Sequence, residues 1–287
     1  MLFAIKMWAV RAVACATLVV GLCPPALADD PPRRIVSFNV CADQLVLALA
    51  DPAQIAGLSP YAADPTISTM ADKARDFRRL GWQAESVIPL DPDLVLVGSW
   101  DRSLTQRLLR ALGFRVVAVD VVADLAGART QIRQIAALVG HPERGEALIA
   151  QIDAARGQLA QAPRPFAATA LLVGNGGYTV GPASLAAALM AQAGLKSPPG
   201  APAGYGGFVP LEQLIMLRPD FLVMSNLIER PDGQGALYLT HPALQTFYPP
   251  DRRIILPSRY TLCGGPALVE AFHYLAAVLN RLARTQP

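Results

Sequence analysis

The stretch "ESVIPLDPDLVLV", residues 85–97, begins as a short helical pattern, meets a Pro-Asp pair and continues as an apolar strand. The stretch "EQLIMLRPDFLVM", residues 212–224, has the same order, and five of the thirteen positions are identical. In both, a glutamate (Glu85 or Glu212) opens the helix, where the helix dipole favours a negative charge, and the proline ends it. The repeat predicts that one structural unit occurs twice.

The sequence on either side of both stretches alternates between strand and helix patterns. "RRIVSFNV" is typical of a strand, "CADQLVLALA" of a helix, and "QIAGLS" of a second strand. After "APRPF" the alternation resumes with "ATALLVG" and "SLAAALMAQAG". Strands that alternate with helices predict parallel sheets. We therefore expect an α/β fold with two α/β lobes, each built on a parallel sheet.

Between the two halves the pattern is almost entirely helical, from Asp124 to about Gln161, with one interruption at "VGHPERG". The second helical piece keeps an apolar spacing of three or four residues, which predicts one amphipathic helix. About twenty residues at about 1.5 Å each give a helix of roughly 30 Å. The predicted organisation is a signal peptide at 1–28, an N-terminal lobe at 29–140, a long connecting helix at 141–163 and a C-terminal lobe at 164–287.

The chain begins like an exported protein. Lys6 and Arg11 precede an apolar run from Ala12 to Leu22, and an Ala-Leu-Ala sequence ends at Ala28. This order is typical of a secretory signal peptide cleaved near Ala28. The apolar run is shorter than the roughly 20 residues of a membrane-spanning helix. We therefore expect export to the periplasm in soluble form.

Composition excludes some classes of function. The net charge of the 287 residues is +3, and the leader holds two of the basic residues and no acidic ones. The nearly neutral remainder gives no case for a nucleic-acid partner. The three histidines, His141, His241 and His273, lie far apart, and there is no His-Glu-x-x-His or Gly-x-Ser-x-Gly motif. We therefore expect neither an enzyme nor a site for a free metal ion.

Two of the four cysteines, Cys41 and Cys263, lie outside the leader. Three interpretations are open: a disulfide bond, which the oxidising compartment favours, a pair of thiolates for a soft metal complex, or two free cysteines.

Candidate ligand-binding residues follow from the rule that parallel α/β units bind ligands at the carboxyl ends of their strands. Aromatic side chains there suit a large, flat, partly apolar ligand, and an arginine suits an anionic group. Trp82 can equally pack in the core, Arg259 can be an ordinary surface residue, and the Gly-rich loop around Tyr178 can be only a turn. The candidates are Asn39, Cys41, Trp82, Trp100, Tyr178, Tyr205, Phe208, Arg259, Tyr260 and Cys263.

Four segments carry a resemblance to a known family: "RIVSFNVCADQLVLALA", "DFRRLGWQAESVIPLDPDLVLVG", "GYGGFVPLEQLIMLRPDFLVM" and "YTLCGGPALVEAFHYL". The sequence resembles the periplasmic binding proteins of ABC importers for ferric siderophores, cobalamin or haem. The resemblance implies two lobes joined by a single long helix, with the ligand cleft between the lobes. It also implies that Glu85 and Glu212 dock against arginines of the permease dimer at the inner membrane. The alternative is that each glutamate only complements its helix N-terminus.

The expected function is capture of a metal chelate in the periplasm and its delivery to the permease. A ferric siderophore is the first candidate, and cobalamin and haem are the others. The protein needs no cofactor, because the iron or cobalt belongs to the cargo, and we expect a monomer. The alternatives are a hydrolase that uses Cys41 or Cys263, and a partner-binding module of the same fold without a role in transport.

Overall fold

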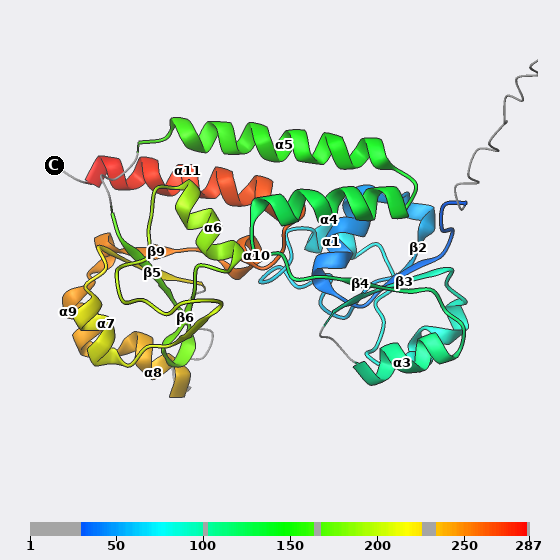
Figure 1. Cartoon of the computed structure of the whole chain (residues 1–287), viewed down its shortest axis with the longest axis horizontal. Helices are drawn as coiled ribbons and strands as arrows, with labels where there is room; N and C mark the ends of the chain where they lie inside the picture. Colours follow the sequence, from blue (N-terminus) through cyan, green and yellow to red (C-terminus); the bar gives the residue numbers. More distant parts are fainter. Residues whose placement is uncertain (1–29, 100–102, 164–167, 226–233, 286–287) are drawn as a thin grey trace, which may run out of the picture. The chain divides into compact units, whose positions relative to one another are not determined.

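The protein contains two β-sheets, seen in a computed structural model that describes residues 30–99, 103–163, 168–225 and 234–285 (Figure 1). The first sheet has the strand order β2 (Ile55–Gly57), β1 (Ile35–Ser37), β3 (Leu94–Gly98) and β4 (Val116–Val119), and all its pairings are parallel. The second has the order β7 (Gly206–Phe208), β6 (Tyr178–Val180), β5 (Ala170–Val173), β8 (Phe221–Met224) and β9 (Arg253–Ile255). The predicted α/β fold with two sheets is confirmed.

Helices connect the strands in both halves. The first half contains α1 (Val40–Leu49), α2 (Ala71–Ala74), α3 (Ser103–Ala111) and α4 (Leu125–Leu138), with 3-10 turns η1 (Pro52–Gln54), η2 (Ala84–Ser86) and η3 (Ile88–Leu90). The second half contains α6 (Leu185–Gln192), α7 (Leu211–Leu217), α8 (Gln234–Thr240), α9 (Pro242–Phe247), α10 (Ser258–Thr261) and α11 (Ala267–Thr285), with turns η4 (Asn175–Gly177) and η5 (Pro250–Arg252). In the sequence, helix α5 (Pro142–Gln161) comes between the two sets of helices.

Successive residues of each strand point to opposite faces of its sheet, and helices cover both faces. In the first sheet, Ile35 and Leu94 face α1 and α4, whereas Val36 and Val95 face η2 and α3. Figure 1 shows α1 and α4 on one side of this sheet and α3 on the other. Strands buried on both faces explain why their sequences are continuously apolar.

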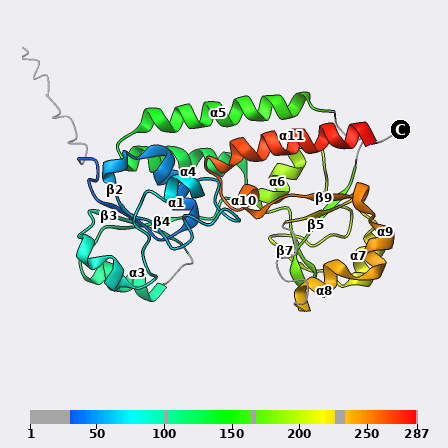
Figure 2. The same ribbon diagram turned by 180° about the vertical axis from the view of Figure 1, so that it is seen from behind.

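One hydrophobic core runs through both halves of the chain. It contains Ile35 and Leu94 of the first sheet, Ala170 and Phe221 of the second, and the buried faces of α4, α5 and α11. Helix α5 lies beside α11, as both views show (Figures 1 and 2), and also packs against α4. The long connecting helix predicted at 141–163 is therefore present as α5, and it packs against α4 and α11.

The repeated sequence corresponds to repeated structure. In the first sheet β3 pairs in parallel with β1 and β4, and in the second β8 pairs in parallel with β5 and β9. Ile35 lies opposite Leu94, and Ala170 lies opposite Phe221, which is the residue equivalent to Leu94 in the repeat. The prediction that the second sheet is parallel holds for β5, β8 and β9 only, because β6 and β7 pair antiparallel.

The short helix predicted to begin at Glu85 is present as 3-10 turns and not as an α-helix. Residues 84–90 form the two 3-10 turns η2 and η3, whereas the equivalent residues after Glu212 form the α-helix α7. The cause is Pro89, which has no N–H to donate to the carbonyl of Glu85 and whose ring obstructs that carbonyl. The equivalent residue in α7 is Met216, which keeps its N–H.

The predicted signal peptide and Trp100 lie outside the described residues. Among the helices that the structure describes, none is long and apolar enough to cross a membrane. The same part of the chain contains no cluster of three or more His, Cys, Asp or Glu side chains arranged to hold a metal ion.

Candidate ligand site

A small crevice lies at the carboxyl ends of β1, β3 and β4, where the sequence predicts ligand contacts. Its volume is about 170 Å³, and its walls come from α1, the ends of the three strands, α4 and the loop around Leu262. Small-molecule sites usually measure roughly 300–1,000 Å³. The crevice can therefore hold only part of a large chelate, such as one of its side groups.

Polar groups line one side of the crevice. The amide oxygen of Asn39 caps α1 by accepting hydrogen bonds from the backbone N–H groups of Cys41 (2.9 Å) and Ala42 (3.3 Å). The hydroxyl of Ser99 donates to the carboxylate of Asp120, and Gln131 Nε2 donates to the Asp120 carbonyl at 2.7 Å. Asp120 and Gln131 are not among the residues predicted from the sequence. Asp120 directly follows β4, so the strand-end rule could have found it, whereas nothing local marks Gln131 in α4.

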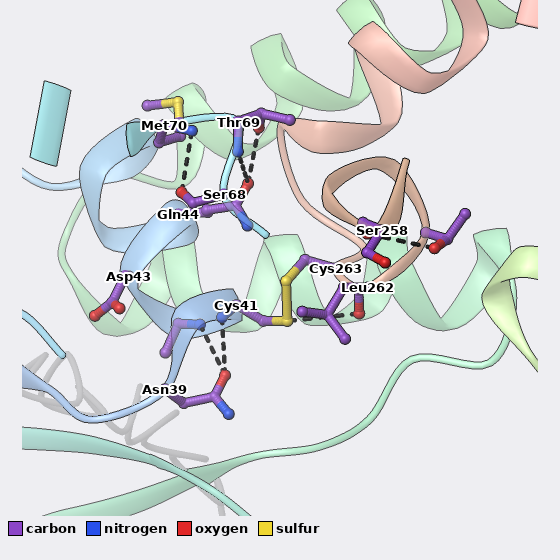
Figure 3. Close-up of a disulfide and its surroundings, with 12 residues drawn as sticks. Asn39, Cys41, Asp43, Gln44, Ser68, Thr69, Met70, Ser258, Leu262 and Cys263 are labelled. Carbon is purple, nitrogen blue, oxygen red and sulfur yellow. Dashed lines mark hydrogen bonds between the residues drawn. A yellow bond between two sulfur atoms is a disulfide. The ribbon is translucent and has the colours of Figure 1, made fainter. Parts of the chain in front are cut away.

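The two cysteines outside the leader form a disulfide bond, with an S–S distance of 2.08 Å and a Cα–Cα distance of 5.1 Å (Figure 3). Of the three interpretations, this is the one that the structure contains. The bond fastens the N-terminus of α1 to the loop after α10, and Leu262 and Gly264 of that loop line the crevice. Cys263 is 1% exposed. Its thiol is used in the disulfide, which was one of the predicted alternatives, and its contact with a ligand stays a prediction.

Arg259 and Tyr260 form a pair in α10, directly before the same loop. Arg259 Nη2 donates to the Tyr260 hydroxyl at 3.0 Å, and its guanidinium carbon lies 4.9 Å from the centroid of that ring. The ring of Tyr260 also packs against Tyr274 at 5.0 Å and is buried. Tyr260 thus packs in the core, and its predicted contact with a ligand stays a prediction. Within the part of the chain that the structure describes, no carboxylate lies within ion-pair distance of Arg259.

Three of the predicted aromatic residues are exposed on or directly before the antiparallel strands β6 and β7. Tyr178 is 40% exposed, and Tyr205 and Phe208 are each 74% exposed. Tyr178 lies opposite Phe208 in the ladder, and their ring centroids are 5.5 Å apart in an edge-to-face contact. The glycine-rich loop before Tyr178 is a tight connection from β5 to β6. At Gly177 (φ +81°) a Cβ atom would lie 2.6 Å from the carbonyl oxygen of Val209, so only glycine fits.

Trp82 is half-buried and belongs to the core on the η2 and α3 side of the first sheet. Its ring contacts the half-exposed ring of Tyr61 at 5.1 Å, edge to face. The core role that the sequence left open for Trp82 is therefore the main one. Tyr61 lies in a loop without an apolar pattern, so this pairing could not be predicted from the sequence.

Both motif glutamates are exposed. Glu85 lies in η2, and Glu212 lies in the first turn of α7. No ion pair joins either carboxylate to another residue within the described ranges. Both side chains are available to a partner.

A buried acid lies in α1, two residues from Cys41. Asp43 is fully buried, and its carboxylate accepts hydrogen bonds from Ser59 N (3.1 Å) and Ser59 Oγ (2.5 Å). Burial raises the pKa of Asp43 to about 7, against the opposing effect of hydrogen bonds from Ser37 and Ser59. The sequence predicted no role for this residue, because it sits within an amphipathic pattern where an acid is expected on the exposed side.

The parallel strand repeats, the paired acidic motifs and the crevice at the strand ends are the features to compare with known proteins. A family model for periplasmic binding proteins matches residues 35–198, more than half of the chain. The chain therefore belongs to the periplasmic binding protein family and is a solute-binding protein. Comparison with curated proteins gives no match.

Solved structures share the fold. The periplasmic heme-binding protein RhuT from Roseiflexus sp. RS-1 aligns with a TM-score of 0.70 and 23% identity, over 88% of this chain and 99% of that chain. The periplasmic vitamin B12 binding protein BtuF of Vibrio cholerae aligns with a TM-score of 0.66 and 18% identity, over 89% and 99%. A protein of an ABC-type Fe3+-hydroxamate transport system from Saccharomonospora viridis DSM 43017 gives 0.63 and 21%, over 86% and 93%. At these identities the likeness establishes the fold.

Proposed function

We propose that this protein is the solute-binding component of an ABC importer and that its solute is an iron or cobalt chelate, with a ferric siderophore as the first candidate. The protein performs no reaction on the solute and uses no cofactor of its own. The metal arrives within the chelate. The similar structures include a heme-binding protein, a vitamin B12 binding protein and a protein of an Fe3+-hydroxamate transport system, which supports a chelate as the ligand class.

The exposed aromatic residues of β6 and β7 are the observation that carries this proposal. Tyr178 of β6 and its ladder partner Phe208 of β7 present apolar area to solvent side by side, and Tyr205, directly before β7, is exposed as well. Exposed aromatic side chains that gather in one place usually mark a binding surface, because their burial by a ligand is favourable. Their ring faces suit a flat or ring-shaped ligand of large apolar area.

Arg259 supports a siderophore, because catecholate and carboxylate siderophores are anionic. Its guanidinium makes hydrogen bonds only to the Tyr260 hydroxyl and, at 3.4 Å, to the Pro65 carbonyl, among the bonds found in the described residues. Neither acceptor carries a negative charge. The positive charge of Arg259 acts on the Glu270 carboxylate without forming an ion pair in the described residues, so the guanidinium can still pair with an anionic group of the ligand.

Haem is the second candidate, and Tyr178 favours it. Its half-exposed phenol oxygen makes no hydrogen bond within the described residues, so it is available as an iron ligand. A haem propionate would then suit Arg259 as well as a siderophore carboxylate does.

A cysteine-dependent hydrolase is disfavoured. Nucleophilic catalysis by cysteine requires a free thiolate, and both Cys41 and Cys263 are consumed in the disulfide. The nearest histidine in sequence to Cys263 is His273, which lies exposed on α11.

Ligand titration of the purified protein tests the proposal. Haem, cyanocobalamin, a ferric hydroxamate and a ferric catecholate are added in turn, and tryptophan fluorescence is recorded. We expect one of them to quench the fluorescence saturably at micromolar concentration or below, and Phe208→Ala to weaken its affinity at least about tenfold through lost aromatic contact. Phe247→Ala removes a similarly exposed ring from α9 and should leave the affinity unchanged.

A variant of Tyr178 distinguishes haem from a siderophore as the ligand. Tyr178→Phe removes only the phenol oxygen, so it should weaken haem binding and leave siderophore binding intact. If none of the four chelates binds, the cargo proposal is wrong.

Docking to a permease dimer is the second part of the proposal and rests on Glu85 and Glu212. The alternative, that each glutamate only complements a helix dipole, fits Glu212 in α7. It does not fit Glu85, because a three-residue 3-10 turn has little dipole to complement. A partner that binds both carboxylates accounts for the occurrence of an exposed glutamate at both equivalent positions.

The remaining parts of the proposal concern organisation. We propose that residues 29–140 and 164–287 act as two lobes with the ligand cleft between them, that the leader is removed near Ala28, and that the mature protein works in the periplasm as a monomer. The family supports the periplasmic location.

A further inference from the structure

Helix α3 exposes a stripe of three leucines. Leu104 is 72% exposed, Leu108 is 44% and Leu112 is 52%, while Leu109 and Gln106 of the same helix are buried against the first sheet. Leu112 follows the last residue of α3, but its N–H still bonds to the Leu108 carbonyl at 3.0 Å, so it extends the helical stripe. At 3.6 residues per turn, positions 104, 108 and 112 lie on one side of the helix.

Arginines flank this stripe. Arg107 and Arg110 are exposed on the neighbouring side of α3, and Arg115 is exposed in the turn that follows. Residues 103–119 include no acidic residue. Across the parts of the chain that the structure describes, none of the three arginines forms an ion pair. The helix is thus amphipathic toward solvent, with an apolar strip beside a purely basic one.

The same helix is attached to the segment that holds Glu85. Helix α3 packs against η2, and the Thr105 hydroxyl donates to the Trp82 carbonyl at 3.5 Å. In Figure 1, α3 lies on the side of the first sheet away from α1 and α4. If Glu85 meets a permease, α3 is carried to the membrane that contains the permease.

From these observations we infer that the Leu104, Leu108 and Leu112 stripe with Arg107, Arg110 and Arg115 is a membrane-surface contact that binds anionic phospholipid. Leucines that enter the interface while adjacent arginines pair with phosphate groups are typical of helices that lie on membranes. The location of this contact beside the permease rests on the proposed function, whereas the affinity for anionic lipid rests on α3 alone.

Charge favours lipid over the other occupants of such a stripe. A second copy of this protein would bring the same three arginines against the first three, and like charges repel. A neutral apolar groove in another protein would leave the arginines without partners. Anionic headgroups satisfy the arginines, and the acyl boundary covers the leucines.

Vesicle sedimentation tests the inference. The chain from Asp29 onward is used, because it contains the whole compact unit Pro31–Pro287 and lacks the apolar leader, which would bind lipid by itself. We expect binding to vesicles of phosphatidylcholine mixed with phosphatidylglycerol, and much weaker binding to phosphatidylcholine alone or in high salt. The triple variant Leu104→Ser, Leu108→Ser, Leu112→Ser and the double variant Arg107→Gln, Arg110→Gln should each weaken binding at least about tenfold.

Matched controls remove the same groups from other surfaces. Leu237→Ser removes an exposed leucine from α8, and Arg75→Gln with Arg284→Gln removes two exposed arginines. These controls should bind vesicles like the wild type, and circular dichroism should show that all variants are folded. Absence of wild-type binding to the anionic vesicles, or equal binding by the triple variant and the wild type, would overturn the inference.

Two further measurements keep this inference separate from the proposed function. Light scattering must show a monomer, because a dimer that the leucine variant abolishes would replace lipid by a second copy and overturn the inference. Chelate affinity should be the same for the wild type and the α3 variants. If vesicles bind but no chelate does, the cargo proposal fails and the lipid contact stands.

Discussion

The two repeated segments, residues 85–97 and 212–224, enter their central strands through the same backbone conformation, but the structures before that point differ. In both, a non-glycine residue adopts the left-handed conformation before the proline: Asp91 at φ 44° and Arg218 at φ 46°. In both, the following aspartate binds the backbone that leads into the neighbouring strand. The segments before these residues differ, since one forms two 3-10 turns and the other an α-helix. The difference teaches that the repeat preserves the connection into the central strand more strictly than the helix before it.

The disulfide has no counterpart within the repeat, because it joins one half to the other, and its removal should have the largest effect. Cys41 and Cys263 are separated by 222 residues. Closing so long a loop in the unfolded chain predicts a loss of about 3–5 kcal/mol for the Cys41→Ser, Cys263→Ser double variant. Thermal unfolding with and without reductant measures it. Reductant should lower the melting temperature of the wild type only, and an unchanged wild-type melting temperature would contradict the prediction.

Asp43 is a second asymmetry, because α6 of the second half carries no acidic residue. The pKa of Asp43 is raised from 3.8 to about 7 by burial, so the folded state holds the proton more tightly than the unfolded state. The stability contribution is therefore present in full below about pH 4 and is lost as the pH rises to about 7, by up to about 4 kcal/mol. Urea unfolding across this range should give a flatter profile for Asp43→Asn. Identical slopes for both proteins would show that Asp43 does not titrate there.

Met216→Pro tests the stated cause of the difference between the repeats by giving the second segment the proline of the first. The side chain of Met216 is largely exposed, so the cost should come from the backbone of α7, at about 3 kcal/mol. Met216→Ala is the matched control and should change the free energy of unfolding by less than about 0.5 kcal/mol. Equal stabilities of the two variants would mean that Pro89 is not the reason for the 3-10 turns.

Replacement of Asp93 or Asp220, the aspartates that follow the two prolines, should lower the free energy of unfolding by a similar amount. Asp93 accepts hydrogen bonds from Arg33 N (2.7 Å) and Arg34 N (2.9 Å), and Asp220 accepts from Thr169 N (2.7 Å) and Thr169 Oγ1 (2.8 Å). Replacing either by alanine should cost about 1–2 kcal/mol in urea unfolding. A cost at only one position would mean that the aspartates are not equivalent.

Lowering the pH should weaken the stabilising hydrogen bonds that Asp220 accepts from Thr169. Its pKa is lowered chiefly by the hydrogen bond from the Thr169 backbone, so its stabilising effect is present above about pH 4 and is lost as the pH falls further. The Asp220→Ala variant should therefore approach the wild type in stability in acid.

The repeat, the parallel strands β3 and β8, and helix α5 could be predicted because each depends on local pattern: buried parallel strands are continuously apolar, and a long helix keeps its spacing. The antiparallel strands β6 and β7 could not, because each has only three residues, which is too short for an alternation to be detected, and two of the three residues of β7 are glycines. The strand-end rule selected Asn39, which lines the crevice, and Tyr178, which is exposed, and it also selected Tyr260 and Cys263, which are buried. The rule locates a backbone segment and does not show which side chains of that segment are buried.

The central claim is that the equivalent glutamates of the two repeats act together on one partner. Cellular import of the chelate found by titration, measured for Glu85→Ala, Glu212→Ala and the double variant, tests it directly. A Glu143→Ala, Asp76→Ala variant removes two other exposed carboxylates as a control. We predict comparable partial losses for the single variants, near-complete loss for the double variant, and unchanged chelate affinity in all. Import by the double variant at the wild-type rate would contradict the account.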